Sequence, residues 1–393
     1  MQKRYFLLLF LAFSFFGSFA QNPKLSVYSE VSVFTLGPGD ALFETFGHNA
    51  LRIKDPLLRL DIVYNYGTFD FNEPGFYANF ALGRLEYWLG LARFKNFEAS
   101  YNYQQRWMKE QILDLTQEEK QAFFDFLQNN ALPDNRRYLY DPYFDNCSTK
   151  IRDITQVILG DQVEFASDYT QEDMTLRKLM NAELPWNTWG SFGIHLSLGT
   201  KLDQTLTADK YVYLPDYLYL AFKGATKTEN GVTKPLVKEE KDLLEYEERP
   251  FPSDWYNPFM IFLLVLALVI YITFKNLKKE ERSRWIDFLL FFVTGIMGSL
   301  IVFLWFFTNH QTAPNNFNFL WAFAPNLIVA FISLKKNPPN WMKGYAKLCL
   351  VFLLIAVCLW IFQVQLFSLT IIPLLAALAS RYLYLGGLLP SKK

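Results

Sequence analysis

The chain has 393 residues, which is more than one ordinary domain needs, so at least two domains are expected. Its 38 basic residues are balanced by 38 acidic residues with no basic stripe, which argues against a nucleic-acid-binding protein. Hydrophobic residues make up 51% of the chain and aromatic residues 18%, and they are unevenly distributed. Residues up to about 255 have a mixed, soluble character, whereas the remainder is a series of long apolar runs.

The N-terminus has the three parts of a secretory signal peptide. The positive pair Lys3 and Arg4 precedes an apolar segment, 5–16. Small residues at the −3 and −1 positions, Ser18 and Ala20, predict cleavage after Ala20. The alternative is an uncleaved anchor helix, and in both cases the domain that follows is exported.

The C-terminal part contains five apolar runs that can each cross the hydrocarbon core, which needs about 20 residues. They span residues 257–274, 286–308, 318–334, 347–364 and 367–387. Basic residues concentrate in the linkers after the first and third runs and at the C-terminus, so the positive-inside rule predicts an external N-terminal domain and a cytoplasmic C-terminus. The interiors of the runs carry almost no ionisable groups, which argues against a transporter and favours an anchor or lipid platform.

Local patterns in the exported half predict two strands and then a helix. The segments 50–53 and 62–66 have strand patterns and lie on either side of a turn. Thr116 is the expected N-cap of a helix that has acidic residues in its first turn and ends at Pro133.

A further helix is expected to begin near Cys147 in the stretch "DNCSTKIRD", with Asp145 or Asn146 as its N-cap. Cys147 is the one cysteine outside the apolar runs. A lone cysteine is usually an inert small hydrophobe, but the polar flank here favours a nucleophile. The positive end of a helix dipole lowers a thiol pKa. The N–H groups of the same turn, at Asn146 and Ser148, are candidates for an oxyanion hole.

A nucleophilic cysteine needs a base, and the chain has three histidines. His48 lies at the mouth of the first predicted strand, after Gly47, and is the favoured base. His195 lies in an apolar alternating stretch that indicates a structural position, and His310 lies in the outer loop between the second and third apolar runs.

The third group of such a site, which orients the imidazole, is expected on the adjacent strand or turn. Asn65 and Asp70, both in "YNYGTFDF", are the candidates, with Asn65 slightly ahead. No two histidines or cysteines stand at ligand spacing, so neither a metal nor another cofactor is predicted.

The motifs "FGHNALRI", "YNYGTFDF" and "DNCSTKIRD" resemble the periplasmic domain of the Lnb-type bacterial lipoprotein N-acyltransferases. The stretch "NHQTAPNNFNFLWAFAPN" resembles the start of the membrane region of the same family. The order of histidine before cysteine is that of circularly permuted papain-like enzymes, the NlpC/P60-like and lecithin:retinol-acyltransferase-type groups. The resemblance implies an α+β architecture with a signal peptide (1–20), a permuted papain-like periplasmic domain (21–255) and an all-α domain of five transmembrane helices (256–393) in the bacterial inner membrane.

The resemblance also implies a reaction. Cys147 would take an acyl chain from a phospholipid as a thioester, with His48 as base, and pass it to the N-terminal amine of a lipid-modified lipoprotein. One alternative is a membrane-anchored peptidase or amidase of the cell envelope that uses the same two residues. Another is a non-enzymatic envelope scaffold, in which Cys147 is buried and unreactive. The multispanning platform favours the acyltransferase, because a cell-wall amidase needs no more than one anchor.

Overall fold

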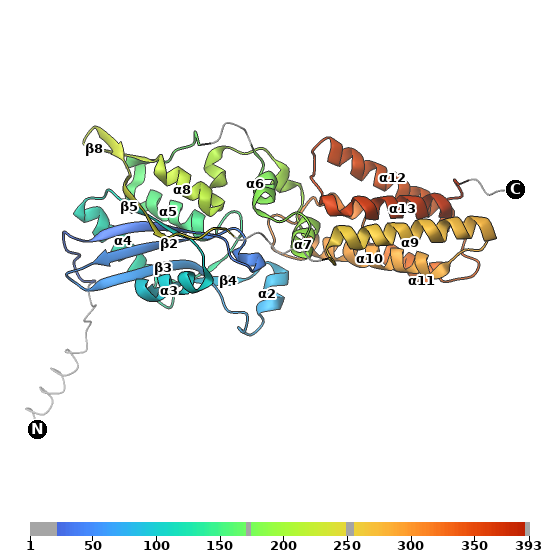
Figure 1. Cartoon of the computed structure of the whole chain (residues 1–393), viewed down its shortest axis with the longest axis horizontal. Helices are drawn as coiled ribbons and strands as arrows, with labels where there is room; N and C mark the ends of the chain where they lie inside the picture. The colour runs from blue at the N-terminus through green and yellow to red at the C-terminus, as the bar shows by residue number, and fades with distance from the viewer. Residues whose placement is uncertain (1–21, 170–173, 249–254, 390–393) are drawn as a thin grey trace, which may run out of the picture.

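The computed structural model describes residues 22–169, 174–248 and 255–389, so the predicted signal peptide lies outside the described residues. The described chain forms a mixed α/β domain followed by a bundle of long helices, and the two lie end to end along the long axis of the molecule (Figure 1).

The α/β domain is built on one antiparallel sheet with the strand order β10-β5-β1-β2-β3-β4-β6. Its strands are β1 (Glu30–Leu36), β2 (His48–Asp55), β3 (Leu60–Thr68), β4 (Glu86–Arg93), β5 (Met108–Leu113), β6 (Arg137–Leu139) and β10 (Val237–Leu244). A smaller sheet joins β7 (Val163–Glu164), β8 (Thr226–Glu229) and β9 (Val232–Pro235). The strands predicted at 50–53 and 62–66 are confirmed as β2 and β3, which pair directly with each other.

Helices cover the two faces of the large sheet unequally. The helices of this domain are α2 (Phe76–Leu82), α3 (Phe94–Gln104), α4 (Gln117–Asn130), α5 (Cys147–Leu159), α6 (Leu176–Glu183), α7 (Trp189–Ser197) and α8 (Pro215–Lys223). Figure 1 shows α5 and α8 on one side of the sheet and α3 on the other. Short 3-10 turns accompany them: η1 (Leu42–Glu44), η2 (Gly160–Gln162), η3 (Thr200–Asp203) and η4 (Ala208–Tyr213).

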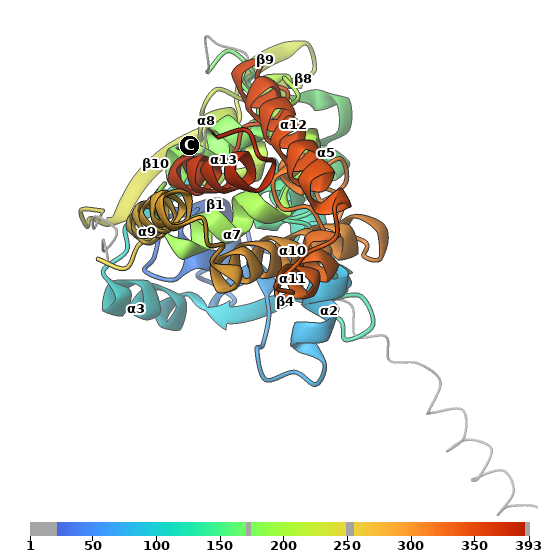
Figure 2. The same cartoon turned by 90° about the vertical axis from the view of Figure 1, so that its right-hand side faces the viewer.

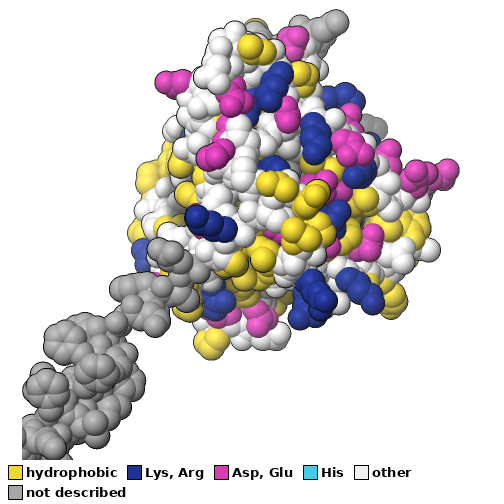
Figure 3. All heavy atoms as spheres, turned by 90° about the vertical axis from the view of Figure 1, so that its left-hand side faces the viewer, with side chains coloured by type: hydrophobic (Ala, Val, Ile, Leu, Met, Phe, Trp, Pro, Cys, Tyr) yellow, Lys and Arg dark blue, Asp and Glu magenta, His cyan; other side chains and the backbone are white. Residues whose placement is uncertain are grey.

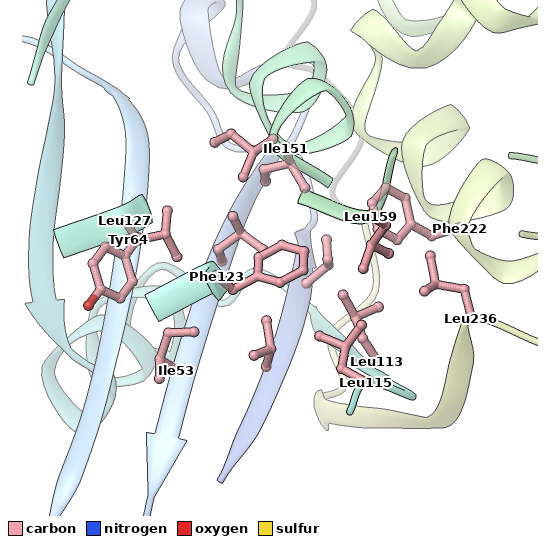
Figure 4. Packing of buried hydrophobic residues seen from close by; sticks show 14 of the residues in the cluster. Ile53, Tyr64, Leu113, Leu115, Phe123, Leu127, Ile151, Leu159, Phe222 and Leu236 are labelled. Atoms are coloured by element: carbon pink, nitrogen blue, oxygen red, sulfur yellow. The ribbon is translucent and has the colours of Figure 1, made fainter. Parts of the chain in front are cut away.

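The main core lies between the sheet and helices α4, α5 and α8. Side chains of the sheet interlock with Phe123 of α4, Ile151 of α5 and Phe222 of α8, all fully buried (Figure 4). On the opposite face a smaller cluster, which includes Phe34 and Phe97, packs beneath α3. Because β1 alternates between these two faces, both of its sides are buried, as expected of a central strand.

The helix predicted after Thr116 is confirmed as α4, and its start is a capping box. The Thr116 hydroxyl accepts a hydrogen bond from the Glu119 N–H at 3.2 Å, and the Glu119 carboxylate accepts one from the Thr116 N–H at 2.7 Å. The adjoining segment before it was not predicted as a strand, yet it forms β5, which lies next to β1 in the sheet.

The five predicted membrane spans are found only in part. Three helices of the described chain are long and apolar enough to cross a membrane: α9 (Pro258–Lys279), α10 (Arg284–Phe306) and α12 (Trp341–Ile361). The third run is divided into η5 (Phe317–Leu320) and α11 (Asn326–Ser333), and the fifth into η6 (Leu369–Ile371) and α13 (Ile372–Leu385). Eight residues of α11 span only about 12 Å, so this segment is too short to cross as a regular helix. Pro325, the residue before α11, explains why that helix begins late in its run, whereas η6 and α13 together form one apolar helix over Leu369–Leu385.

The irregular part of the third run is held inside the bundle by glycines of α10. A Cβ atom added at Gly298 would lie 2.0 Å from the Ala322 carbonyl oxygen, and one added at Gly295 would lie 2.2 Å from the Leu327 nitrogen. Asn326, which is fully buried, donates a hydrogen bond to the Thr294 hydroxyl at 2.9 Å. Non-helical backbone at membrane depth is tolerated where protein surrounds it, as here.

The prediction of almost no ionisable groups within the apolar runs needs one amendment. Asp287 of α10 and Arg381 of α13 are buried and form an ion pair at 2.5 Å. Arg381 also donates to Asn276 of α9 at 2.9 Å. The pair therefore joins α9, α10 and α13 at one end of the bundle.

Helix α7 fixes the α/β domain to the helical domain. Phe192 of α7 stacks edge-on against Phe262 of α9, with 5.4 Å between ring centroids. Two side chains at the start of η5 then bond the end of α7: the N-cap Asn316 donates to the Leu196 carbonyl at 2.7 Å, and Asn318 donates to the His195 carbonyl at 2.9 Å. This combination of apolar packing and directed hydrogen bonds sets the orientation of the α/β domain.

Replacing Gly298 by alanine is expected to destabilise the helical domain by about 2 kcal/mol, because the methyl group has no room against Ala322. Gly344 of α12 is a matched control, since a Cβ there meets no atom within 4 Å. Thermal unfolding of the full-length protein in detergent should show a lower Tm for Gly298→Ala and an unchanged or higher Tm for Gly344→Ala. Equal Tm values for both variants would contradict the described packing.

Candidate functional site

Two neighbouring strands place His48 beside Asn65. His48 is the first residue of β2 and Asn65 lies in β3, and the two strands form a hairpin. The His48 Nε2 atom lies 2.5 Å from the Asn65 side-chain oxygen, which accepts its hydrogen bond. This bond engages Nε2, so Nδ1 is the ring nitrogen that remains for a second partner. The imidazole lies beside the Cys147 thiol, close enough for the charges of the two groups to interact.

Cys147 is the first residue of α5, as predicted, and Asn146 is its N-cap. The Asn146 side-chain oxygen accepts hydrogen bonds from the N–H groups of Ser148 and Thr149, both at 3.0 Å. The Asn146 amide nitrogen donates to the carbonyl of Tyr213 at 2.7 Å, which ties the start of the helix to η4. Cys147 is only 7% exposed, so its sulfur lies just beneath the surface.

Two glycines with left-handed backbone conformations lie next to His48 and Cys147. Gly47 has a left-handed φ of 74°, and a Cβ there would lie 2.6 Å from the Leu36 carbonyl oxygen. Gly67 has a φ of 89°, and a Cβ there would point between His48 and Cys147, 3.9 Å from each. Glycine is favoured at both positions because other residues rarely adopt this backbone conformation.

The site lowers the pKa of the thiol in spite of its burial. Burial alone raises the pKa of Cys147, because a thiolate is poorly solvated in the interior. The His48 charge, the hydrogen bond from His48 and a backbone hydrogen bond from Asn49 outweigh burial and lower the pKa to about 7. In turn, burial lowers the pKa of His48, but the Cys147 charge and the bond to Asn65 raise it above its ordinary value. The pair is therefore stabilised as thiolate and imidazolium.

The second candidate for the orienting group, Asp70, lies elsewhere. Its carboxylate is exposed and accepts a hydrogen bond from the Asn72 N–H at 2.8 Å in a surface turn. Of the two residues that the sequence left open, the structure brings only Asn65 to His48.

The expected oxyanion donors are arranged differently from the prediction. The Ser148 N–H points to the Asn146 side chain, and the Ser148 hydroxyl donates to the Asn49 side-chain oxygen at 2.6 Å. Within the described residues, the Cys147 N–H has no hydrogen-bond partner. The donor at the helix start that is available to a substrate oxygen is consequently the N–H of Cys147 itself.

Sequence reasoning missed two neighbours of the site. Asn49 follows His48 directly and contributes its N–H to the sulfur and its side chain to Ser148. Tyr140 has its ring 3.7 Å from the position of a Cβ on Gly67 and so forms one wall of the site. The signal for Asn49 was its place next to the proposed base, whereas Tyr140 is brought in by the turn before α5.

The other histidines lie away from the thiol. His195 is buried in α7, a helix and not the alternating stretch that was expected, and burial followed by the charge of Arg177 lowers its pKa to about 3. His310 lies near α2, with its ring 6.5 Å from that of Phe80. Among the described residues, no group of three His, Cys, Asp or Glu side chains could hold a metal ion.

Comparison with protein families agrees with this two-part organisation. Residues 21–188 match the Lnb N-terminal periplasmic domain, and residues 250–392 match the Lnb transmembrane domain. The chain belongs to the Lnb family and is a membrane protein with a periplasmic domain. Neither the curated proteins nor the solved structures that were searched gave a match.

Replacing Asn65 by alanine should raise the pKa of Cys147, because the imidazolium loses the oxygen that stabilises it. Loss of a hydrogen bond to a charged group costs enough free energy to lower the alkylation rate at pH 7 by about tenfold. Asp70→Ala is the matched control and should leave the rate unchanged. The measurement is the pH dependence of iodoacetamide labelling at Cys147, followed by peptide mass spectrometry.

The His48→Ala variant shows how far the labelling midpoint of Cys147 moves when the whole imidazole is removed. With the imidazolium removed and burial retained, the labelling midpoint should move upward from about 7, and the rate at pH 7 should fall. An Asp70→Ala variant that titrates like His48→Ala, beside an unaffected Asn65→Ala, would show that the orienting group was assigned to the wrong residue.

Proposed function

We propose that the protein is a membrane-bound thiol acyltransferase of lipoprotein-modifying type. The observation that carries the proposal is the buried Cys147 thiol, ionised near neutral pH by His48, on a domain fixed to a membrane bundle. A thiolate is a strong nucleophile toward ester carbonyls, and covalent catalysis divides a slow aminolysis into two faster steps. No metal or other cofactor is needed for this chemistry.

The first step forms the acyl-enzyme. The Cys147 sulfur attacks the carbonyl carbon of a phospholipid ester, and the Cys147 N–H stabilises the oxyanion of the tetrahedral intermediate. The C–O bond then breaks as the His48 imidazolium donates its Nδ1 proton to the departing glycerol oxygen. The products are a thioester on Cys147, a lysophospholipid and neutral His48.

The second step transfers the acyl group. The α-amino group of a lipid-modified N-terminal cysteine attacks the thioester carbonyl, and neutral His48 accepts the proton that the amine loses. The C–S bond breaks as the new amide forms, which regenerates the thiolate and imidazolium. Throughout both steps Asn65 holds the imidazole in position through Nε2.

The architecture supports the same proposal. A histidine on one strand, an asparagine on the next and a cysteine opening a helix against the sheet fit a permuted papain-like, NlpC/P60-like site. The membrane bundle would hold this site at the outer face of the inner membrane, with the C-terminus cytoplasmic, as the basic linkers indicate. Donor and acceptor lipids share that surface, so tethering raises their effective concentration at Cys147.

The purified full-length protein in phospholipid vesicles should add one acyl chain to a diacylglyceryl-cysteine peptide with a free N-terminus, as detected by mass spectrometry. Cys147→Ala should abolish the addition, and a peptide whose amine is acetylated should remain unmodified. Release of free fatty acid without amide formation, or cleavage of cell-wall peptides, would instead support the hydrolase alternative with the same two residues. A Cys147 thiol that does not react at all would support the non-enzymatic scaffold alternative.

A further inference from the structure

A set of large apolar side chains is exposed on the part of the α/β domain that adjoins the helical domain. This apolar patch consists of Leu42 and Phe43 of η1, Phe71 of the turn after β3, and Tyr77 and Phe80 of α2. Their exposed fractions are 45%, 56%, 45%, 70% and 57%. The ring of Phe43 contacts that of Phe71 at 5.7 Å, and the buried Phe76 links Phe71 to Tyr77, with ring distances of 5.1 and 5.4 Å. A contiguous exposed patch of aromatic residues marks an interaction surface.

An aromatic stack leads from the patch to the reactive thiol. Phe69 packs edge-on against Phe43 at 5.4 Å and Phe71 at 4.9 Å, and its ring stacks on Tyr87 at 4.8 Å. Tyr87 in turn stacks on Tyr140 at 4.2 Å. Tyr140 is the wall of the site described above, so a succession of ring contacts connects the exposed patch to the residues around Gly67.

The outer end of the patch adjoins the membrane-spanning part of the chain. The Asn309 N–H donates to the Leu82 carbonyl at the end of α2, at 2.8 Å. Asn309 follows the outer end of α10 by three residues, and Phe306 and Phe307 at that end are 64% and 67% exposed. Helix α2 is therefore fixed at the level where α10 leaves the hydrocarbon.

The position of α2 relative to the bundle leaves the patch open toward lipid. Viewed along the bundle axis, α2 lies outside the outline of the bundle, next to α10 and α11 (Figure 2). The opposite end of the α/β domain carries Lys, Arg, Asp and Glu side chains interspersed with apolar ones (Figure 3). Tyrosine, here Tyr77, is enriched at membrane interfaces, and Phe and Leu side chains commonly form the face of an interfacial helix that enters the membrane.

We propose that the apolar patch seats in the outer leaflet beside α10, and that the acyl chain of a membrane phospholipid lies along the aromatic stack to reach Cys147. The inference rests on the proposed acyltransferase function and adds the route of the donor. A chain in this position brings its ester carbonyl to the sulfur and covers the site against water, so that the thioester is kept for an amine. The occupant is a lipid chain and not a peptide, because both the patch and the stack are apolar and join the lipid-facing end of α10.

The test compares Tyr77→Asp and Phe80→Asp with the control Tyr28→Asp. Tyr28 is an aromatic residue of similar exposure, 66%. It precedes the first residue of β1, whereas His48 pairs with the last residue of that strand. Thioester formation at Cys147 is measured by intact mass spectrometry of the full-length protein, with dioleoylphosphatidylglycerol vesicles or with water-soluble p-nitrophenyl acetate as donor. The two patch variants should react at least tenfold more slowly with phospholipid and at an unchanged rate with the soluble ester, and Tyr28→Asp should match the unmodified protein with both.

Equal rates of all variants with phospholipid would overturn the route. An equal loss with both donors would also overturn it, because the residues would then support the fold of the site and not the lipid. A wild-type protein that forms a thioester with neither donor would refute the proposed function instead.

Membrane contact can be tested independently of catalysis. A benzoylphenylalanine placed at position 71 should crosslink to the acyl chains of the vesicle lipid on illumination, and one placed at position 28 should not. Crosslinking at neither position, or at both alike, would contradict the seating of the patch.

Discussion

The site depends on one electrostatic constraint: a thiolate buried beneath the surface has to be matched by a positive charge. Burial opposes ionisation of Cys147, and the neighbouring His48 reverses that effect. The two residues are 99 positions apart in the chain, so the match requires the fold. The β2–β3 hairpin holds the imidazole from one side, and the capped start of α5 presents the sulfur from the other. If either support were lost, the ion pair would revert to a neutral thiol and a neutral imidazole.

The membrane domain contributes position and not chemistry. Its buried ion pair at Asp287 and Arg381 and its glycine contacts on α10 hold the bundle together. The start of η5 then holds the end of α7 through hydrogen bonds from Asn316 and Asn318. Both amide side chains are buried and bonded to backbone carbonyls, so this connection is well ordered. It therefore connects the domain that carries Cys147 to the helical domain through α7.

Local sequence patterns predicted the parts of the site whose structure is set by near neighbours. The strands β2 and β3 and a helix N-cap at Asp145 or Asn146 each follow from a few adjacent residues, as does the choice of Cys147 and His48, and the structure selects Asn146 as the N-cap. What could not be predicted is what long-range packing decides. The sequence left both Asn65 and Asp70 open, with Asn65 only slightly ahead, and the folded hairpin places Asn65 against His48 while Asp70 lies in a surface turn.

The membrane part shows the same limit. Hydropathy identified five apolar runs but not that the third is broken, because its buried asparagines find partners only in the folded bundle. The sheet strands at β1, β5 and β10 likewise owe their pairing to distant residues. The functional residues divide in the same way. Cys147 and His48 were predicted from the sequence, whereas the apolar patch beside α2 forms only when η1, the turn after β3 and α2 come together in the fold.

The central claim is that Cys147 carries a lipid-derived acyl group. Intact mass spectrometry of the full-length protein after incubation with phospholipid, beside Cys147→Ala, tests it most directly. The account predicts a mass increase of one acyl chain that hydroxylamine removes and that the variant lacks. A folded protein whose Cys147 is labelled by iodoacetamide at pH 7 but never acquires this adduct would contradict it.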